Sequence, residues 1–260
     1  PFLMHQSAAF NITGRISNVE AMYLHEFLPL LSSKILPNPL PIFIYKEELQ
    51  SHMVGIFKES GFRAGYKEII ERLFEDYKKD LGNYYLLNWA NSSDGIIFRD
   101  LDFVAKFEFY FDAQIDDHFN VNSTYTIRNI FDFQNEVLQT VFNNNLIVKT
   151  KDGGIIQKYF DDIEPKFCKS SLNYIQIMKY RKACYDFVYK SKRNSITREM
   201  FRDMLLISIL EDIRLDEYKN NNHTEYFNIR KKLNIWFSLY EKFITNKEDK
   251  QLMASKLKDY

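Results

Sequence analysis

Three consecutive residues, Asp116, Asp117 and His118, form the most compact group of side chains with metal-binding chemistry in this chain. Asp102 and Asp112 lie nearby in the sequence, and carboxylates of this kind are ligands that suit Mg²⁺ or Mn²⁺ in a hydrolytic site. No second histidine group follows at ligand spacing, and acidic turns exposed to solvent are common. The group is compatible with a metal-dependent nuclease, but we expect a solvated turn and no metal.

Other catalytic patterns are missing from the sequence. It contains no Gly-x-Ser-x-Gly motif, no Walker phosphate loop and no Gly-x-Gly-x-x-Gly motif, so it gives no support for a serine hydrolase or for nucleotide-driven activity. Cys168 and Cys184 have no histidine beside them and are too far apart for a Cys-x-x-Cys motif. We therefore expect core thiols in a reducing, cytoplasmic compartment, with no catalytic residues and no cofactor.

The second chemical feature is a basic segment over residues 166–202, which holds ten Lys and Arg residues against two acidic ones. Several of the cations recur at three- and four-residue steps, as on one helix face, and Tyr185 and Tyr189 lie on an adjoining strip. Cations that follow phosphates, beside rings that stack on unpaired bases, are typical of sequence-independent binding to single-stranded nucleic acid. The candidate contacts are Lys166, Lys169, Lys179, Arg181, Lys182, Lys190, Lys192, Arg193, Arg198 and Arg202.

Two other interpretations of this segment remain open. An ordinary solvated helix face, with its tyrosines half-buried in a core, fits the pattern equally well. The preceding residues 100–142 carry eight acidic and two basic side chains, and they could neutralise the basic segment within the protein. In that case the chain would be a protein-interaction scaffold without nucleic-acid contact.

The elements that must position these residues follow from local signals. A capping box of Ser17 and Glu20 predicts the start of a helix over 18–33, and the prolines of 36–41 exclude a helix there. The other elements expected in the first part of the chain are an extended segment at 42–44, helices at 46–58 and 66–81, a β-hairpin of 83–89 with 95–98, a helix from a Thr126 cap to Phe142, and a second hairpin of 146–148 with 155–159.

After Pro165 the chain contains neither proline nor glycine, and the absence of these helix breakers predicts an almost wholly helical module. Because residues 201–210 are apolar nearly all round, we expect them to form the central helix of a bundle. The predicted helices span 171–190, 197–218, 224–245 and 247–258. The fold class is thus mainly α (α+β), with a mixed α/β-hairpin region at 1–165 and a helical bundle at 166–260. The sequence shows neither an apolar run long enough to cross a membrane nor a signal peptide, so no membrane contact is expected.

Three segments carry a resemblance to a known family: Leu36 to Ile44 after a capped helix, Asn83 to Trp89, and Asp100 to Val104. In these apolar and turn patterns, and in the order of elements over residues 1 to about 165, the chain resembles the large subunit of type I-B CRISPR Cascade, of the Csh type. The basic helical part looks like that family's small-subunit-like bundle. The resemblance, and a start at Pro1, imply the C-terminal portion of such a subunit.

The resemblance also implies a role. The chain would be a non-catalytic subunit that supports R-loop formation, in which the guide RNA reads the sequence and the protein holds backbone and displaced strand. Its partners would be the other Cascade subunits, guide RNA, target DNA and a recruited helicase-nuclease. No family motif fixes the contact residues, so the ten cations above are charge-based candidates.

Overall fold

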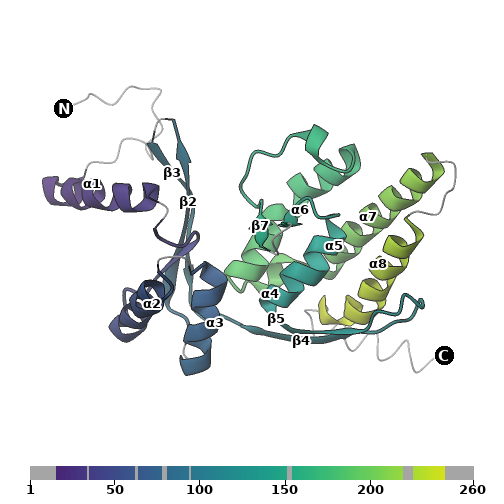
Figure 1. Ribbon diagram of the computed structural model, residues 1–260, viewed down its shortest axis with the longest axis horizontal. Helices are drawn as coiled ribbons and strands as arrows, with labels where there is room; N and C mark the ends of the chain where they lie inside the picture. Colours follow the sequence, from purple (N-terminus) through teal and green to yellow (C-terminus); the bar gives the residue numbers. More distant parts are fainter. Residues whose placement is uncertain are drawn as a thin grey trace. The chain divides into compact units, whose positions relative to one another are not determined.

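The computed structural model describes residues 16–33, 35–61, 64–77, 81–93, 95–150, 154–218 and 225–243 (Figure 1). The chain divides into two compact units: unit 1 comprises Pro1–Lys79 and Asn83–Phe103, and unit 2 comprises Asp80–Gly82 and Val104–Tyr260. The fold is mainly helical with small antiparallel sheets, which confirms the α+β class. Within the described ranges, no helix is long and apolar enough to span a membrane.

Unit 1 packs helices against a three-stranded sheet of order β1-β2-β3. The Ser17–Glu20 capping box forms as predicted, with the Ser17 amide donating to the Glu20 carboxylate at 2.6 Å. Trp89 packs with Leu31 and donates from its ring nitrogen to the Leu31 carbonyl at 3.1 Å. The elements are α1 (Asn18–Ser32), β1 (Leu40–Ile42), α2 (Glu47–Glu59), α3 (Tyr66–Tyr77), β2 (Tyr84–Ser92) and β3 (Gly95–Val104).

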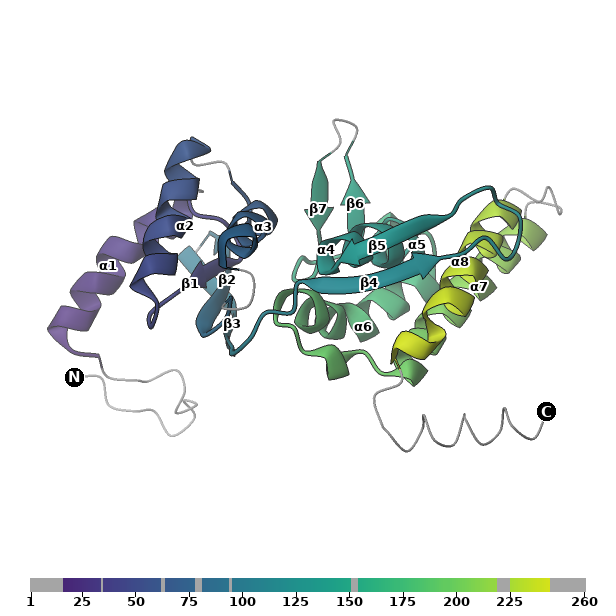
Figure 2. The same ribbon diagram turned by 90° about the horizontal axis from the view of Figure 1, so that it is seen from below.

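Unit 2 places a central helix against a set of long C-terminal helices (Figure 2). The central helix runs from Ile130 to Val141 as α4 (Ile130–Asp132), a π-helical part (Phe133–Leu138) and α5 (Gln139–Val141). The remaining elements are β4 (Tyr110–Ile115), β5 (Tyr125–Asn129), β6 (Ile147–Lys149), β7 (Ile155–Gln157), α6 (Ser171–Tyr189), α7 (Arg198–Tyr218) and α8 (Tyr226–Leu239), which continues as a 3-10 turn at Tyr240–Phe243. The helix predicted at 247–258 lies outside the described residues.

The start of the central helix differs from the sequence prediction. Thr126 does not cap a helix, because it lies in strand β5, pairs with Gln114 of β4 and donates to the Gln114 side chain at 2.9 Å. The cap is Asn129, whose side-chain oxygen accepts from the amides of Phe131 and Asp132 at 2.9 Å each. A threonine suits a strand as well as a cap, and only the pairing with β4 decides between them.

Helix α7 contains residues 201–210, which the sequence predicted as the buried central helix of a bundle, but this helix is not buried on all sides. Phe201, Met204 and Leu205 are buried, whereas Leu206 and Leu210 are exposed. These last two residues are four apart and therefore share one face of the helix. The helix lies at the surface of unit 2, and its composition did not reveal which side faces the core.

The two units divide near residue 103, whereas the sequence pattern predicted a division at residue 165. The reason is that the central helix and β4 belong to the same core as the C-terminal helices. Phe111 of β4 and Phe133 of the central helix have ring centroids 4.7 Å apart, and both contact Phe187 of α6 and Phe243 after α8. A hydrophobic core of this kind joins segments that composition alone assigns to different regions.

Candidate functional site

The group Asp116-Asp117-His118 forms a structured turn. The Asp117 carboxylate accepts from the amides of Val121 and Asn122 at 2.8 Å each and from the Asn234 side chain of α8 at 2.9 Å. These hydrogen bonds, of which the one from Val121 has the largest effect, lower the pKa of Asp117.

Neither neighbour of Asp117 adds to a ligand set. The Asp116 amide donates to the Ser238 hydroxyl at 3.0 Å, and the His118 ring lies 6.0 Å from the ring of Phe237. Among the described residues, no group of three His, Cys, Asp or Glu side chains is arranged to hold a metal ion. The turn therefore joins the β4–β5 loop to α8, and the geometry gives the nuclease alternative no ligand set in the part of the chain that is described.

The candidate nucleic-acid contacts fall into two groups of five. In the first group the side chains are buried or half-buried and contact other residues of unit 2. Lys190 is buried and pairs with Asp186 at 3.0 Å, and Arg193 pairs with Glu108 at 3.0 Å while its guanidinium lies 5.0 Å from the Phe187 ring. Burial lowers the pKa of Arg193, against the effect of Glu108. The others in this group are Lys169, which belongs to a buried polar network, Arg181, which donates to the Asp161 carbonyl at 2.7 Å, and Arg198, which lies over the Tyr240 ring.

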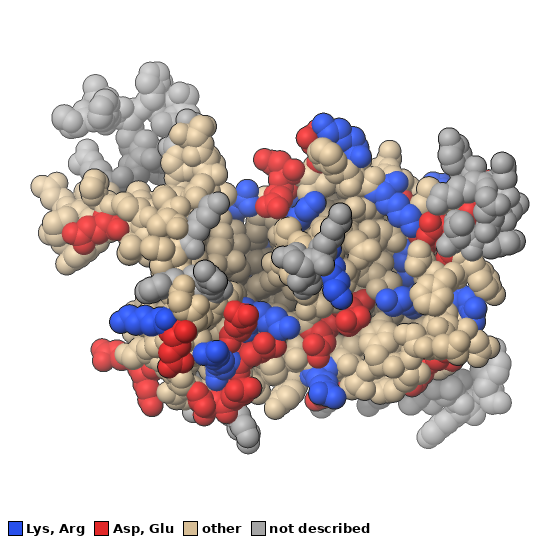
Figure 3. Space-filling model, in the orientation of Figure 1, with Lys and Arg blue, Asp and Glu red and all other residues tan. Residues whose placement is uncertain are grey.

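The second group consists of exposed cations. Three of these side chains are more than half exposed and form surface ion pairs: Lys166 with Glu164 at 2.7 Å, Lys179 with Asp203 at 2.8 Å and Lys182 with Asp186 at 2.7 Å. Lys192 and Arg202 are exposed as well. On the face drawn in Figure 3, basic and acidic side chains are interspersed. Lys166, Lys179 and Lys182 each have an acidic side chain beside them, so these three cations lie in a mixed field and not in a uniformly positive one.

The tyrosines expected to stack on bases are core residues. Tyr185 and Tyr189 are at most 5% exposed, and their rings stack on each other with centroids 4.9 Å apart. Tyr159 contacts both rings and donates from its hydroxyl to the Gln134 side chain at 3.0 Å. The aromatic strip of α6 thus packs against the central helix and the segment before α6, and these rings offer no platform for a base.

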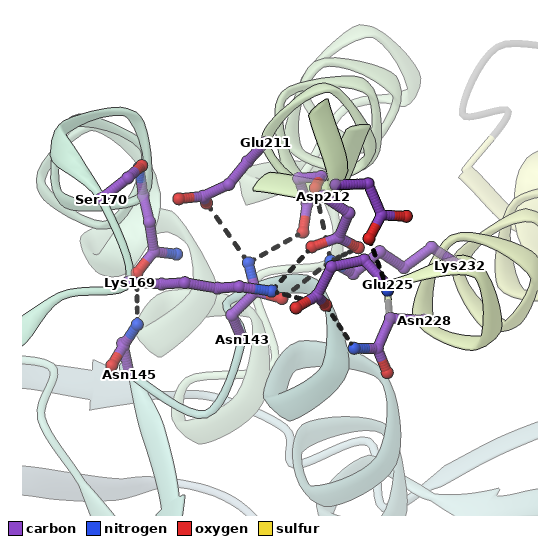
Figure 4. A network of polar contacts seen from close by, with 12 residues as sticks. Asn143, Asn145, Lys169, Ser170, Glu211, Asp212, Glu225, Asn228 and Lys232 are labelled. Atoms are coloured by element: carbon purple, nitrogen blue, oxygen red, sulfur yellow. Dashed lines mark hydrogen bonds and ion pairs between the residues drawn. The ribbon is translucent and has the colours of Figure 1, made fainter. Parts of the chain in front are cut away.

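A buried polar network was not foreseen from the sequence and is the most unusual chemical feature of unit 2 (Figure 4). The ammonium group of Lys232 in α8 is fully buried and pairs with the fully buried carboxylate of Asp212 in α7 at 2.5 Å. Lys232 also donates to the side chain of Asn143 at 2.7 Å and to the carbonyl of Ser208 at 3.3 Å. All three of its donors are therefore used, as a buried ammonium group requires.

A second lysine approaches the same carboxylate from the other side (Figure 4). Lys169, just before α6, pairs with the second oxygen of Asp212 at 2.9 Å and with Glu225 at 3.0 Å. Glu225 in turn accepts from the Asn228 side chain at 2.7 Å. The network thus ties α7 and α8 to the segment that precedes α6.

The titratable groups of the network respond to burial in different ways. Burial lowers the pKa of Lys232, and Asp212 opposes that effect. Burial also acts to lower the pKa of Lys169, but hydrogen bonds to Asp212 and Glu225 outweigh it, so that this pKa is raised. Burial raises the pKa of Glu211, whose carboxylate has one oxygen near the Asn143 amide at 3.3 Å and another without a hydrogen-bond partner. The network therefore favours the charged form of Lys169, whereas burial disfavours the charged forms of Lys232 and Glu211.

One side of this network opens into a cleft of about 540 Å³. The C-terminal end of the central helix, β6, Lys169 and the first turns of α8 contribute its lining. The lining residues are Glu136, Gln139, Thr140, Asn143, Asn144, Lys149, Lys169, Glu225, Asn228, Lys231 and Lys232. The cleft is polar throughout and holds four lysines against two glutamates.

Of the residues in this cleft, the sequence pointed only to Lys169 as a binding residue. The one signal that touched the rest was the run Asn143-Asn144-Asn145, which indicated merely the end of a helix. Asn143 and Asn144 have φ of 52° and 59°, a left-handed conformation that Asn tolerates better than most residues. The turn directs Asn143 into the network and leaves Asn144 at the cleft.

Comparison with protein-family models, with characterised proteins and with solved structures gives no match to this chain. Its function must therefore be inferred from the residues and contacts themselves.

Proposed function

We propose that this chain is a non-catalytic subunit of a type I CRISPR RNA-guided surveillance complex, in which unit 2 holds nucleic acid by its phosphates without reading sequence. The resemblance of the N-terminal segments to the type I-B large subunit suggests the assembly. The observation that carries the binding role is the set of five exposed cations, Lys166, Lys179, Lys182, Lys192 and Arg202.

The ion pairs of these cations do not prevent phosphate binding. An exposed ion pair is worth about 0 to 1 kcal/mol, so a phosphate can replace Glu164 beside Lys166 or Asp203 beside Lys179 at low cost. Because Tyr185 and Tyr189 are buried, stacking on unpaired bases is not part of the mechanism. We therefore expect electrostatic binding with little preference for single over double strands.

A salt titration tests this function. The full chain is titrated with labelled single-stranded and duplex DNA at several salt concentrations, beside a variant in which the five exposed cations are changed to Gln. The slope of log K against log salt should become shallower by roughly 0.7 to 0.9 for each phosphate that the variant no longer neutralises. A matched variant with five Gln substitutions in unit 1, at Lys46, Lys58, Lys67, Arg72 and Arg99, controls for the change in net charge.

The outcomes separate the proposal from its rival. Salt-sensitive binding that only the unit 2 variant loses supports it. Equal weakening by both variants would mean that net charge alone attracts DNA, and absence of binding would refute the nucleic-acid role.

A protein-interaction scaffold without nucleic-acid contact is the second candidate, and an exposed apolar strand favours it. β3 is a terminal strand of its sheet, and Ile97, Leu101 and Phe103, which share one face of the strand, are exposed. The scaffold candidate also expects the acidic residues 100–142 to neutralise the basic segment. Among the ion pairs described for that segment, the pair of Arg193 with Glu108 is the one that does so. Light scattering on the unaltered chain and on an Ile97→Lys/Leu101→Lys variant tests this candidate. If the variant loses a self-assembled or complexed state but still binds DNA, the result favours the scaffold.

A further inference from the structure

The charges that line the polar cleft of unit 2 are not all used within the protein. Lys169 and Lys232 are committed to Asp212 and Glu225. Lys149 at the end of β6 and Lys231 in α8 have no ion-pair partner in the described part of the chain. The cleft therefore presents two ammonium groups that can bind a ligand.

Two uncharged donors accompany these lysines. The side-chain amides of Gln139 and Asn144 line the cleft, and within the described ranges neither forms a hydrogen bond. The lining also holds one carboxylate without a partner there, that of Glu136. The balance of uncommitted charge is thus two positive against one negative, with two amide donors beside them.

We propose that this cleft binds a phosphate monoester dianion, with Lys149 and Lys231 as its charged contacts and the amides of Gln139 and Asn144 as further donors. A phosphate monoester carries three strong acceptor oxygens and close to two negative charges at neutral pH, which match two lysines and two amides. A cleft of about 540 Å³ lies within the size range of small-molecule sites. Its lining offers no aromatic ring, so recognition is directed at the phosphate and not at a base.

The buried network beneath the cleft holds the site in place. Lys232 and Asn228 are on the same helix as Lys231, and the network ties that helix to α7 and to Lys169. The amide of Asn144 is held by the turn that sends Asn143 to Lys232. The site shares no residue with the five exposed cations of the proposed backbone contact, so the two proposals can fail separately.

Isothermal titration of the full chain with inorganic phosphate tests the site directly. Changing Lys149 and Lys231 to Gln should weaken phosphate binding at least about tenfold, because a hydrogen bond to a charged group is worth about 1.5 to 3 kcal/mol. Changing Glu136 to Gln should strengthen binding roughly two- to fivefold, as expected for one nearby surface charge. A Lys58→Gln/Lys67→Gln variant in unit 1 is the control and should bind phosphate as the unaltered chain does.

Two results would overturn the proposal: no phosphate binding by the unaltered chain, or equal binding by the Lys149→Gln/Lys231→Gln variant. Circular dichroism shows that each variant is folded before it is titrated. The source of the phosphate is distinguished by competition between a 5′-phosphorylated oligonucleotide, its unphosphorylated counterpart and adenosine monophosphate. Displacement of inorganic phosphate by the phosphorylated strand assigns the site to a strand end, and displacement by the mononucleotide alone assigns it to a small molecule.

Discussion

Replacing Lys232 by Met should destabilise unit 2 by about 3 kcal/mol. The ammonium group is fully buried and pairs with Asp212 at 2.5 Å, and a methionine of similar length cannot donate to Asp212, Asn143 or the Ser208 carbonyl. Breaking a buried ion pair by removing one partner costs about 3 to 5 kcal/mol. The lower end applies, because Lys169 still pairs with Asp212 at 2.9 Å.

The partner substitution should cost more. Changing Asp212 to Asn removes the carboxylate that two lysines share, and it leaves Lys232 buried without a compensating charge. We expect a loss of about 4 to 5 kcal/mol. In the double variant, the uncompensated ammonium group is absent, so the two losses should be less than additive by about 1 to 3 kcal/mol.

Denaturant unfolding of the full chain measures these losses. The chain has two tryptophans, Trp89 in unit 1 and Trp236 in unit 2, so fluorescence in a Trp89→Phe background follows unit 2. A loss of about 3 kcal/mol corresponds to a fall in Tm of about 6 to 12 °C for a unit of this size. Lys67→Met, at an exposed pair with Glu71, is the control and should change stability by less than about 0.5 kcal/mol. A Lys232→Met variant as stable as that control, or an Asp212→Asn variant milder than Lys232→Met, would refute the reasoning.

Three further predictions concern single side chains. Asn129→Ala should destabilise unit 2 by about 1 kcal/mol through loss of the helix cap. Thermal unfolding compares this variant with Thr126→Ala, and an equal loss of stability in Thr126→Ala would contradict the assignment of the cap to Asn129. Burial raises the pKa of Glu211 above its ordinary 4.5, so the folded state binds the proton more tightly than the unfolded state does, and stability falls as the pH rises from the unfolded-state pKa to the folded-state pKa. Glu211→Gln should flatten that fall, as denaturation curves recorded between about pH 4.5 and 7.5 can show. An equal fall with pH in the variant and in the unaltered chain would contradict this prediction. Burial raises the pKa of the Cys184 thiol, so an alkylating reagent should modify the less buried Cys168 first, as mass spectrometry of the native chain can show.

Elements governed by local physics were predictable from the sequence. The Ser17–Glu20 capping box, the hairpin now seen as β2 and β3, and the helices α6 and α7 each follow from signals within a few residues. Caps, turns and the absence of helix breakers act over such short separations whatever the rest of the chain does. The α+β class followed from these elements.

The candidate site was less predictable, because a sequence shows that a cation exists but not what neutralises it. Lys169 and Lys190 carry the same charge as Lys166 in the sequence, yet Lys190 is buried, Lys169 belongs to the polar network and Lys166 is exposed. Some of the partners lie far away along the chain: Lys169 is 43 residues from Asp212, and Arg193 is 85 residues from Glu108.

What the sequence determined by itself is therefore the set of local elements and the charge of each segment. The tertiary structure alone decided that Tyr185 and Tyr189 lie in a core, that Thr126 lies in a strand, and that a buried ion-pair network underlies a polar cleft. The physical reason is that burial and pairing depend on which elements pack together. That packing is a property of the whole hydrophobic core and not of any short stretch of residues.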